Sequence, residues 1–324
     1  MKKSSVVIVS PALQDANNGN WQTAQRWARM LSAHYRTRIL KNWDGKDDVS
    51  GSDEVMLALH ARRSADSIAA WHALHGSRGL IVALTGTDLY RDIHSDTRSQ
   101  VSLDAAGRLI VLQELGAQQL PLKHRAKTVT IFQSTGSRKT LPKTSKHLNA
   151  VMVGHLRDEK MPQTLFEAAR LLNDRADIRI THIGAGLDET LAQDAIKTEA
   201  LCAGYTWTRG LKHSQTLSKI QRAHILVHTS KMEGGAHVIM EAVCSGTPVL
   251  ASRMDGNVGM LGADYLGYFP VGDAKALTAL LKRCKDEPRF LDQLSKQCAK
   301  RAPLFSPASE STNLNKLVAQ ALSA

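Results

Sequence analysis

The chain has 324 residues, of which 43% are hydrophobic and 22% are charged. This composition excludes a disordered chain, and the length corresponds to about two ordinary domains. Lysine and arginine (42) exceed aspartate and glutamate (30) by 12, and such a positive excess is typical of proteins that bind an anionic partner. Nucleic acid, anionic lipid and phosphorylated small molecules are the partner classes that the charge admits.

The N-terminal segment predicts a cytoplasmic protein. Residues 6–9 form an apolar run that is too short for a signal peptide, and no run in the chain approaches the length of a membrane span. The four cysteines are widely spaced and form no Cys-x-x-Cys pair, which favours reduced thiols over disulfides or a zinc site.

Short apolar runs alternate with helical patterns through the first half of the chain. A helical pattern begins at Trp21, where apolar residues recur every three or four positions. The runs expected to be strands are residues 6–9, 55–59, 80–84, 109–112 and 129–132. Near-continuous apolar runs of this length indicate strands covered on both faces, and therefore a parallel α/β sheet.

A basic stretch without apolar periodicity, residues 138–147, separates this half from a second α/β series. The expected strands are residues 150–153, 178–180, 225–227 and 248–250, and the expected helices are residues 162–172, 236–245, 274–285, 289–300 and 309–322, with one more from residue 188. The sequence thus predicts two doubly wound domains, 1–137 and 148–305, joined by the linker 138–147. A C-terminal helix within 306–324 can return to the first domain.

The strongest motif lies between the third and fourth of these later strands. Glu233 precedes the pair Gly234 and Gly235, and Glu241 lies eight positions after Glu233. Paired glycines before a helix let backbone N–H groups approach an anion. A carboxylate can accept hydrogen bonds from both hydroxyl groups of a diol. His237, at the start of the expected helix, is a candidate donor to a diphosphate or a sugar. The alternative is an ordinary glycine turn followed by a solvated Glu241.

The complete segment, residues 230–251, resembles the Glu-x7-Glu element of GT-B glycosyltransferases. The resemblance implies two facing Rossmann-like domains and a nucleotide-sugar donor. Residues 153–160 are similar to the family's Gly-Arg-Leu-x-x-x-Lys loop, which implies that Gly154 and Lys160 contact the donor diphosphate. The family's arginine position holds His155, and Arg157 is expected to compensate.

Further parts of the donor site follow from the same resemblance. Gly184 and Gly186 match the family's Gly-x-Gly turn, and residues 206–210 match the stretch beside the nucleotide base, which implies a uracil base. Glu233 is expected to position the sugar, and Lys160 to stabilise the leaving diphosphate. These two residues and His60 are the expected catalytic residues.

Two segments of the first half match family elements on the acceptor side. Thr85, Thr87 and Asp88 belong to a turn similar to the family's (His/Thr)-Gly-Thr-Asp turn, whose alternative is a capped turn after a strand. The sequence Asn18-Gly19-Asn20 lies where the family has a glycine-rich loop, and it implies contacts to the acceptor. Asn20 has the alternative role of capping the helix at Trp21.

Within GT-B, residues 18–24, 60–64 and 84–90 resemble the selenosugar synthases of selenoneine biosynthesis. That resemblance implies transfer from a UDP-sugar, such as UDP-N-acetylglucosamine or UDP-glucose, to selenophosphate. Arg62 and Arg63 follow an expected strand end, and arginine binds phosphate-like groups through two parallel hydrogen bonds. His60 is a third expected donor or a proton carrier. The alternative is that both arginines solvate the start of a helix.

The chain contains no Asp-x-Asp pair, so we expect a donor site that works without metal or other cofactor. No nucleic-acid partner and no membrane insertion are expected. Three alternatives stay open: a conventional glycosyltransferase with a carbohydrate or lipid acceptor, a sugar-nucleotide epimerase, and a nucleic-acid-binding protein. Only the charge suggests the last, because no stacking or groove-reading motif is visible.

Overall fold

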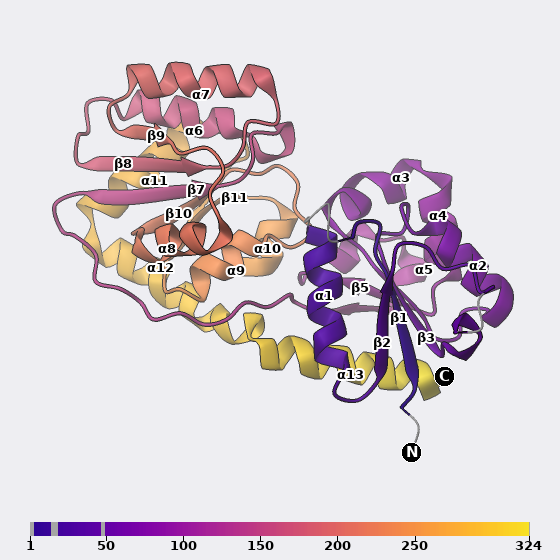
Figure 1. Ribbon diagram of the computed structural model, residues 1–324. Coiled ribbons are helices and arrows are strands. Elements are labelled where there is room, and N and C mark those ends of the chain that lie inside the picture. Colours follow the sequence, from indigo (N-terminus) through magenta and orange to yellow (C-terminus); the bar gives the residue numbers. More distant parts are fainter. Residues whose placement is uncertain (1–2, 14–18, 47–48, 324) are drawn as a thin grey trace. The chain divides into compact units, whose positions relative to one another are not determined.

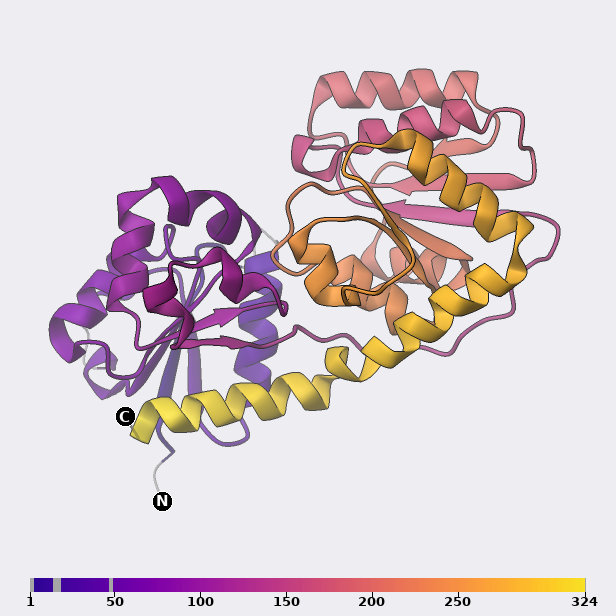
Figure 2. The same ribbon diagram turned by 180° about the vertical axis from the view of Figure 1, so that it is seen from behind.

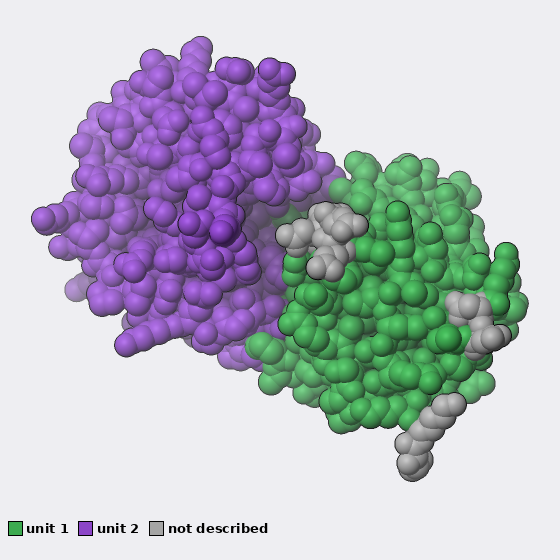
Figure 3. Space-filling view, viewed as in Figure 1, with its two compact units in different colours: residues 1–133, 233–235, 307–324 green, residues 134–232, 236–306 purple. Residues whose placement is uncertain are grey.

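The computed structural model describes residues 3–13, 19–46 and 49–323. The chain divides into two compact units (Figures 1 and 3). Unit 1 comprises Met1–Gln133, Glu233–Gly235 and Pro307–Ala324, and unit 2 comprises Ser134–Met232 and Ala236–Ser306.

Unit 1 is built on a six-stranded sheet with the order β2-β1-β3-β4-β5-β6, in which all neighbouring strands are parallel. Its strands are β1 (Ser5–Val9), β2 (Arg36–Leu40), β3 (Val55–Leu59), β4 (Leu80–Ala83), β5 (Arg108–Val111) and β6 (Thr128–Thr130). Because the strands are parallel, their carboxyl ends meet at one edge of the sheet, where doubly wound folds bind ligands.

Successive side chains of a strand point to opposite faces of the sheet, so the strands of unit 1 contribute to two separate cores. On one face, Val6 and Ile8 pack with Trp27 of α1 (Gly19–Leu31) and Leu317 of α13 (Pro307–Ser323). On the other face, the neighbouring strand residues pack with α2 (Ala65–His75) and α4 (Thr97–Ala105). Figures 1 and 2 show α1 and α13 side by side against the sheet. The remaining helical segments of unit 1 are η2 (Ser50–Ser52), η3 (Asp88–Asp92), α3 (Ile93–Ser95), η4 (Gly116–Gln119) and α5 (Leu122–Arg125).

Unit 2 repeats this architecture with a parallel sheet of order β12-β11-β10-β7-β8-β9. Its strands are β7 (Leu148–Val153), β8 (Ile178–Ile183), β9 (Tyr205–Trp207), β10 (Ile225–His228), β11 (Val249–Ser252) and β12 (Tyr268–Phe269). Its helical segments are η5 (Asp158–Lys160), α6 (Pro162–Leu171), α7 (Glu189–Leu201), α8 (His213–Arg222), α9 (His237–Val243), α10 (Asp255–Leu261), α11 (Ala274–Asp286), α12 (Pro288–Arg301) and η6 (Ala302–Phe305).

The predicted fold class, two doubly wound α/β units, is confirmed. Three strands that the apolar runs do not predict are β2, β9 and β12, and all three lie at sheet edges. An edge strand is covered less completely, so its sequence needs no continuous apolar run. In β2, for example, the sequence is Arg-Thr-Arg-Ile-Leu, and none of its residues is fully buried.

All four cysteines are buried and free. Among the described residues, no helix combines the length and the apolar character that a membrane crossing requires.

The helix α13 is held on unit 1 by a buried carboxylate. Glu310 is 1% exposed and accepts a hydrogen bond from Trp27 Nε1 at 2.7 Å. It also accepts two from the Arg26 guanidinium, at 2.9 and 3.1 Å. The charge is therefore paired with a guanidinium and hydrogen-bonded, as a buried carboxylate must be.

Replacing Glu310 with alanine should lower the free energy of unfolding by about 3 kcal/mol, because removal leaves the Arg26 charge and the Trp27 N–H without their partner. Urea titration followed by tryptophan fluorescence measures this loss, since four of the five tryptophans lie in unit 1. Glu287→Ala is the control, because Glu287 forms an exposed pair with Arg283 whose loss should cost less than about 1 kcal/mol. Equal losses in the two variants would contradict this account of α13.

Candidate active site

In unit 2 the loop after β7 lies against the loop after β8. An added Cβ on Gly184 would lie 1.9 Å from the carbonyl oxygen of Gly154, so no side chain fits at Gly184. An added Cβ on Gly186 would lie 3.0 Å from Ala192 Cβ and 3.1 Å from Trp207 Cη2. The aliphatic stem of Lys160 passes the Cβ position of Gly154 at 3.5 Å. Close packing of the two loops therefore requires glycine at position 184, whereas Gly186 is confined by Ala192 and Trp207, and Gly154 has Lys160 beside it at ordinary contact distance.

His155 occupies the position at which the family has arginine. The backbone N–H of Ala185 donates to His155 Nδ1 at 3.0 Å, which leaves the imidazole proton on Nε2. Burial, assisted by Arg157 and Lys160, holds the pKa of His155 below its ordinary value. A neutral His155 can thus offer one N–H donor at this loop, while Arg157 is exposed and Lys160 is partly buried.

Glu241 lies on α9 and is 9% exposed. It accepts a hydrogen bond from His213 Nε2 at 2.7 Å, and the side chain of His213, at the start of α8, is 73% exposed. The solvated alternative for Glu241 is therefore wrong, because the carboxylate is buried and partnered. His237 is the first residue of α9 and is partly buried.

The predicted base-side stretch, residues 206–210, contains the end of β9 and the loop that follows it. Arg209 adopts a left-handed backbone conformation with φ 62°, and its guanidinium stacks over the Trp207 ring at 3.6 Å from the ring centre. The carbonyl of Arg209 accepts a hydrogen bond from the Gly184 N–H at 2.9 Å. This stretch and the Gly184 loop are therefore joined through the backbone.

In unit 1, Asp88 fixes the turn that follows β3. Its Oδ2 accepts the backbone N–H of Ala61 at 2.8 Å, and its Oδ1 accepts that of Arg62 at 3.4 Å. Asp88 is completely buried, so its position is set by these contacts rather than by solvent. The carboxylate thereby connects the Thr85–Asp88 turn to the turn that carries both arginines.

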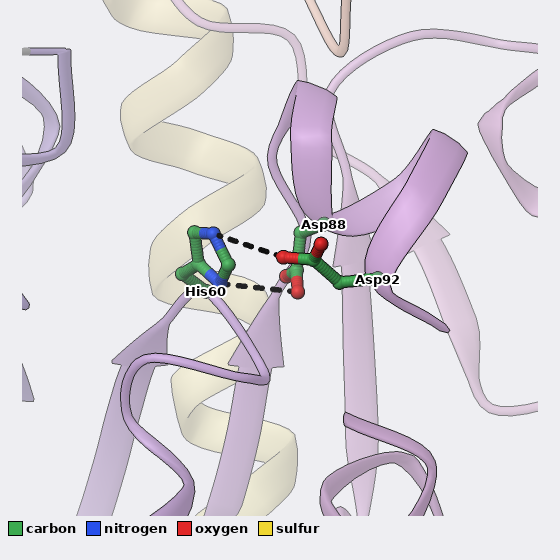
Figure 4. Close-up of side chains that lie close together, drawn as sticks. All are labelled: His60, Asp88 and Asp92. Carbon is green, nitrogen blue, oxygen red and sulfur yellow. Dashed lines mark ion pairs between the residues drawn. The ribbon is translucent and has the colours of Figure 1, made fainter. Parts of the chain in front are cut away.

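His60 lies inside the same cluster (Figure 4). It is 2% exposed and adopts a left-handed conformation, φ 74°, which is strained for a residue with a side chain. Its Nδ1 lies 3.1 Å from Asp88 Oδ1, and its Nε2 lies 3.8 Å from Asp92 Oδ2. The structure thus places His60, the expected donor or proton carrier, between two buried carboxylates.

Among the described residues, one group has side chains placed to hold a metal ion. One ligand atom each from His60, Asp88 and Asp92 lie within 4.8 Å of one another. The backbone N–H groups and arginines around both carboxylates already supply positive partners. The cluster therefore has a structural role that needs no cation, and metal-independent activity stays a prediction.

The two arginines after β3 differ in their partners. Arg62 pairs through Nε with Asp96 at 3.0 Å and lies 3.8 Å from Asp92 Oδ1. Arg63 is exposed and forms no ion pair with a carboxylate in the described part of the chain. Its backbone N–H points at His60 Nδ1, at 3.4 Å. Arg63 thus keeps an uncompensated charge, whereas Arg62 is largely neutralised.

Glu233–Gly235 belongs to unit 1, where it packs against the Thr85–Asp88 turn. An added Cβ on Gly234 would lie 2.5 Å from the backbone nitrogen of Gly86, and one on Gly235 would lie 2.8 Å from Leu112 Cβ. Only glycine permits this approach. Within unit 1, Gly234 and the predicted acceptor turn are thus in direct backbone contact.

The other predicted acceptor residues have simpler surroundings. Thr85 and Thr87 are partly buried, and the Thr85 carbonyl accepts the Leu89 N–H at 2.8 Å. Gly19 and Asn20 begin α1, and Gly19 accepts a hydrogen bond from Thr23 Oγ1. Asn18 lies outside the described residues.

Sequence reasoning missed Asp92, Asp96 and His213. Asp92 and Asp96 follow Asp88 at intervals of four, a spacing that places side chains on one face of a helix and was the available signal. His213 and Glu241 are 28 positions apart in the sequence, and no pattern in the sequence around His213 predicts their contact.

Comparison with known proteins agrees with this geometry. The family model for glycosyl transferases group 1 matches residues 133–304, more than half of the chain. The chain therefore belongs to the glycosyl transferases group 1 family. A comparison with curated protein sequences finds no match.

The solved structures that resemble the chain share its GT-B fold. The Anabaena protein Alr3699/HepE, in complex with UDP and glucose, superposes with a TM-score of 0.75 at 13% identity, over 98% of this chain and 100% of that one. Sucrose-phosphate synthase from Thermosynechococcus elongatus gives 0.78 at 16% identity, over 99% and 100%. The pneumococcal O-GlcNAc transferase GtfA, in complex with UDP and GlcNAc, gives 0.65 at 19%, over 84% and 58%.

Acid should destabilise unit 2 through His182, which is fully buried beneath Gly154. Burial lowers the pKa of His182 to about 4. In the unfolded chain the pKa of histidine is about 6.5. Below this pH, His182 binds a proton in the unfolded chain but stays neutral in the folded chain. Stability is therefore complete above pH 6.5 and falls toward pH 4, by up to about 3 kcal/mol.

The test compares the free energy of unfolding of the wild type and His182→Asn between pH 7 and pH 4. Their difference should change with pH in this window and stay constant above it. A constant difference at all pH values would contradict the assignment.

Proposed function

We propose that this glycosyltransferase transfers a hexose or N-acetylhexosamine from a UDP-sugar to selenophosphate and forms a carbon–selenium bond. One observation carries the proposal. The turn that presents Arg62 and Arg63 is hydrogen-bonded by Asp88, whose own Thr85–Asp88 turn touches Gly234. The turn that carries Arg62 and Arg63 is thereby connected through Asp88 to the loop that carries Glu233. A small, highly charged acceptor needs such cations, whereas a neutral carbohydrate acceptor does not.

A UDP-sugar donor is supported by the family and by the similar structures, which hold UDP with glucose or GlcNAc. In our proposal Lys160, Arg157 and the Nε2–H of His155 bind the donor diphosphate, together with Gly154, Gly184 and Gly186 as close-packed supports. Glu241 accepts hydrogen bonds from the ribose hydroxyls, which replace its hydrogen bond from His213. Glu233 orients the sugar, assisted by His237, and Gly234 and Gly235 let the backbone approach the donor.

The chemistry proceeds by attack of selenium on the anomeric carbon while the bond from that carbon to the diphosphate breaks. UDP leaves with the bonding electron pair, and fixed cations and N–H groups stabilise its charge without metal. Water then cleaves the phosphorus–selenium bond, which releases phosphate and the 1-seleno sugar. Selenium is a polarisable nucleophile on an anionic ester, so no strong base is required for the first step.

The test incubates the purified chain with selenophosphate and a panel of UDP-sugars, and identifies the products by mass spectrometry. We expect a 1-seleno sugar and stoichiometric UDP. A parallel reaction with thiophosphate measures chalcogen preference, and Glu233→Ala is the inactive control. Transfer to a carbohydrate acceptor but not to selenophosphate would replace the proposal by a conventional glycosyltransferase. Donor consumption without any acceptor would point to an epimerase or a hydrolase.

A further inference from the structure

Unit 1 contains a pocket of about 470 Å³ at the carboxyl ends of three neighbouring strands. Pro11 follows β1, Lys41 and Asn42 follow β2, and the Arg62–Arg63 pair follows β3, and all of them line the pocket. This is the sheet edge at which doubly wound folds bind ligands. The pocket therefore lies where a substrate is expected, although Lys41 and Asn42 carry no family motif.

The lining is strongly basic. Lys41, Arg62, Arg63 and Arg98 face a single carboxylate, that of Asp66. Arg98 pairs with Asp66, and Arg62 is engaged by Asp96 outside the lining. Lys41 and Arg63 form no ion pair with any carboxylate that the structure describes. Two uncompensated cations thus remain at the pocket, and like charges held together favour an anion between them.

Two helices add to the positive potential. The first turn of α2, which is separated from Arg63 by the N-cap Ser64, contains Asp66, and the first turn of α4 contains Arg98. Both helices therefore start beside the pocket. The amino end of a helix carries a partial positive charge, which strengthens the attraction for an anion. The charge of the side chains and that of the helix ends have the same sign.

We propose that this pocket binds a phosphoryl-type oxyanion, with Lys41 and Arg63 as its principal ligands and Asn42 and Arg98 as further donors. The inference rests on the proposed function, in which this oxyanion is the phosphoryl group of the acceptor. Arg62 then acts as a positioning residue that braces the turn through Asp96. The planar guanidinium of Arg63 donates two parallel hydrogen bonds to such a group, and the ammonium of Lys41 supplies a point charge.

The test titrates inorganic phosphate, and then thiophosphate, into the full chain by calorimetry in the presence of saturating UDP. UDP occupies the donor site, so the titration reports only a separate site. We expect one phosphate bound per chain. Lys41→Gln and Arg63→Gln should each weaken it by roughly tenfold or more, because each removes a charge-assisted hydrogen bond. Lys41 is exposed, so its variant keeps the test valid if Arg63→Gln does not fold.

The control is Lys316→Gln, which removes the same charge from another basic pocket of unit 1, lined by Arg108 and Lys316. Its phosphate affinity should stay within about twofold of the wild type, since no direct ligand is lost. Three results would overturn the inference: no phosphate binding in the wild type with UDP present, wild-type affinity in both variants, or equal weakening in Lys316→Gln.

The same variants separate this inference from the proposed function. If Lys41→Gln and Arg63→Gln form the seleno sugar with an unchanged acceptor KM, the pocket assignment is wrong and the function stands. If the wild type binds phosphate as expected but forms no seleno sugar, the oxyanion pocket stands and the proposed acceptor is wrong.

Discussion

The carboxylate of Asp88 is the contact on which the site of unit 1 depends. It accepts the N–H groups of Ala61 and Arg62, which would otherwise lose their partner at the end of β3. The left-handed conformation of His60 costs about 1–3 kcal/mol and persists only where surrounding contacts enforce it. Asp88 and Asp92 lie on either side of that imidazole, and only the Asp88 side, at 3.1 Å from Nδ1, is within hydrogen-bonding distance.

This contact holds two neighbouring turns of unit 1 in place. Toward β4, the Thr85–Asp88 turn meets Gly234 so closely that neither Gly86 nor Gly234 tolerates a side chain without displacement. Toward α2, the turn after β3 presents Arg63 while Asp96 restrains Arg62. Asp88 therefore connects the Gly234 loop, on one side, with the turn that carries Arg63 and lines the basic pocket, on the other. This arrangement gives a small part of the excess positive charge a local meaning, because Lys41 and Arg63 line one pocket and lack carboxylate partners among the described residues.

A part of the remaining charge is paired on the surface. Arg175 binds Asp177 and Asp286, and Lys123 binds Asp104. Exposed pairs of this kind contribute little to stability. The charge of the chain is thus a poor guide by itself, and the distribution of unpaired cations over the sheet edge is the informative quantity.

The interior strands were predictable from the sequence because strands covered on both faces need continuous apolar runs. The edge strands β2, β9 and β12 were not, as β2 shows with two arginines in five residues, although the edge strand β6 was predicted. The same contrast holds for the site. Gly234 and Gly235 stood out as a pair before an expected helix and Gly184 through the family resemblance, and the structure shows that close approach admits only glycine at these positions.

Asp96, His213 and Lys41 did not stand out, because their roles arise from contacts or from a pocket that only folding assembles. The sequence offered His60 as a donor to the acceptor or a proton carrier, and the fold buries it among carboxylates. Burial of a polar side chain depends on which turns pack against each other in the fold, and the local composition does not predict that packing.

The most direct test of this account is steady-state kinetics of Asp88→Asn with selenophosphate and a UDP-sugar. The amide keeps the shape of the carboxylate, but its NH₂ group cannot accept an N–H donor, so the turn after β3 loses one restraint. We predict that the KM for the acceptor rises roughly tenfold while the KM for the donor stays unchanged. An unchanged acceptor KM, or a rise confined to the donor, would contradict the claim that Asp88 holds the acceptor side of the site.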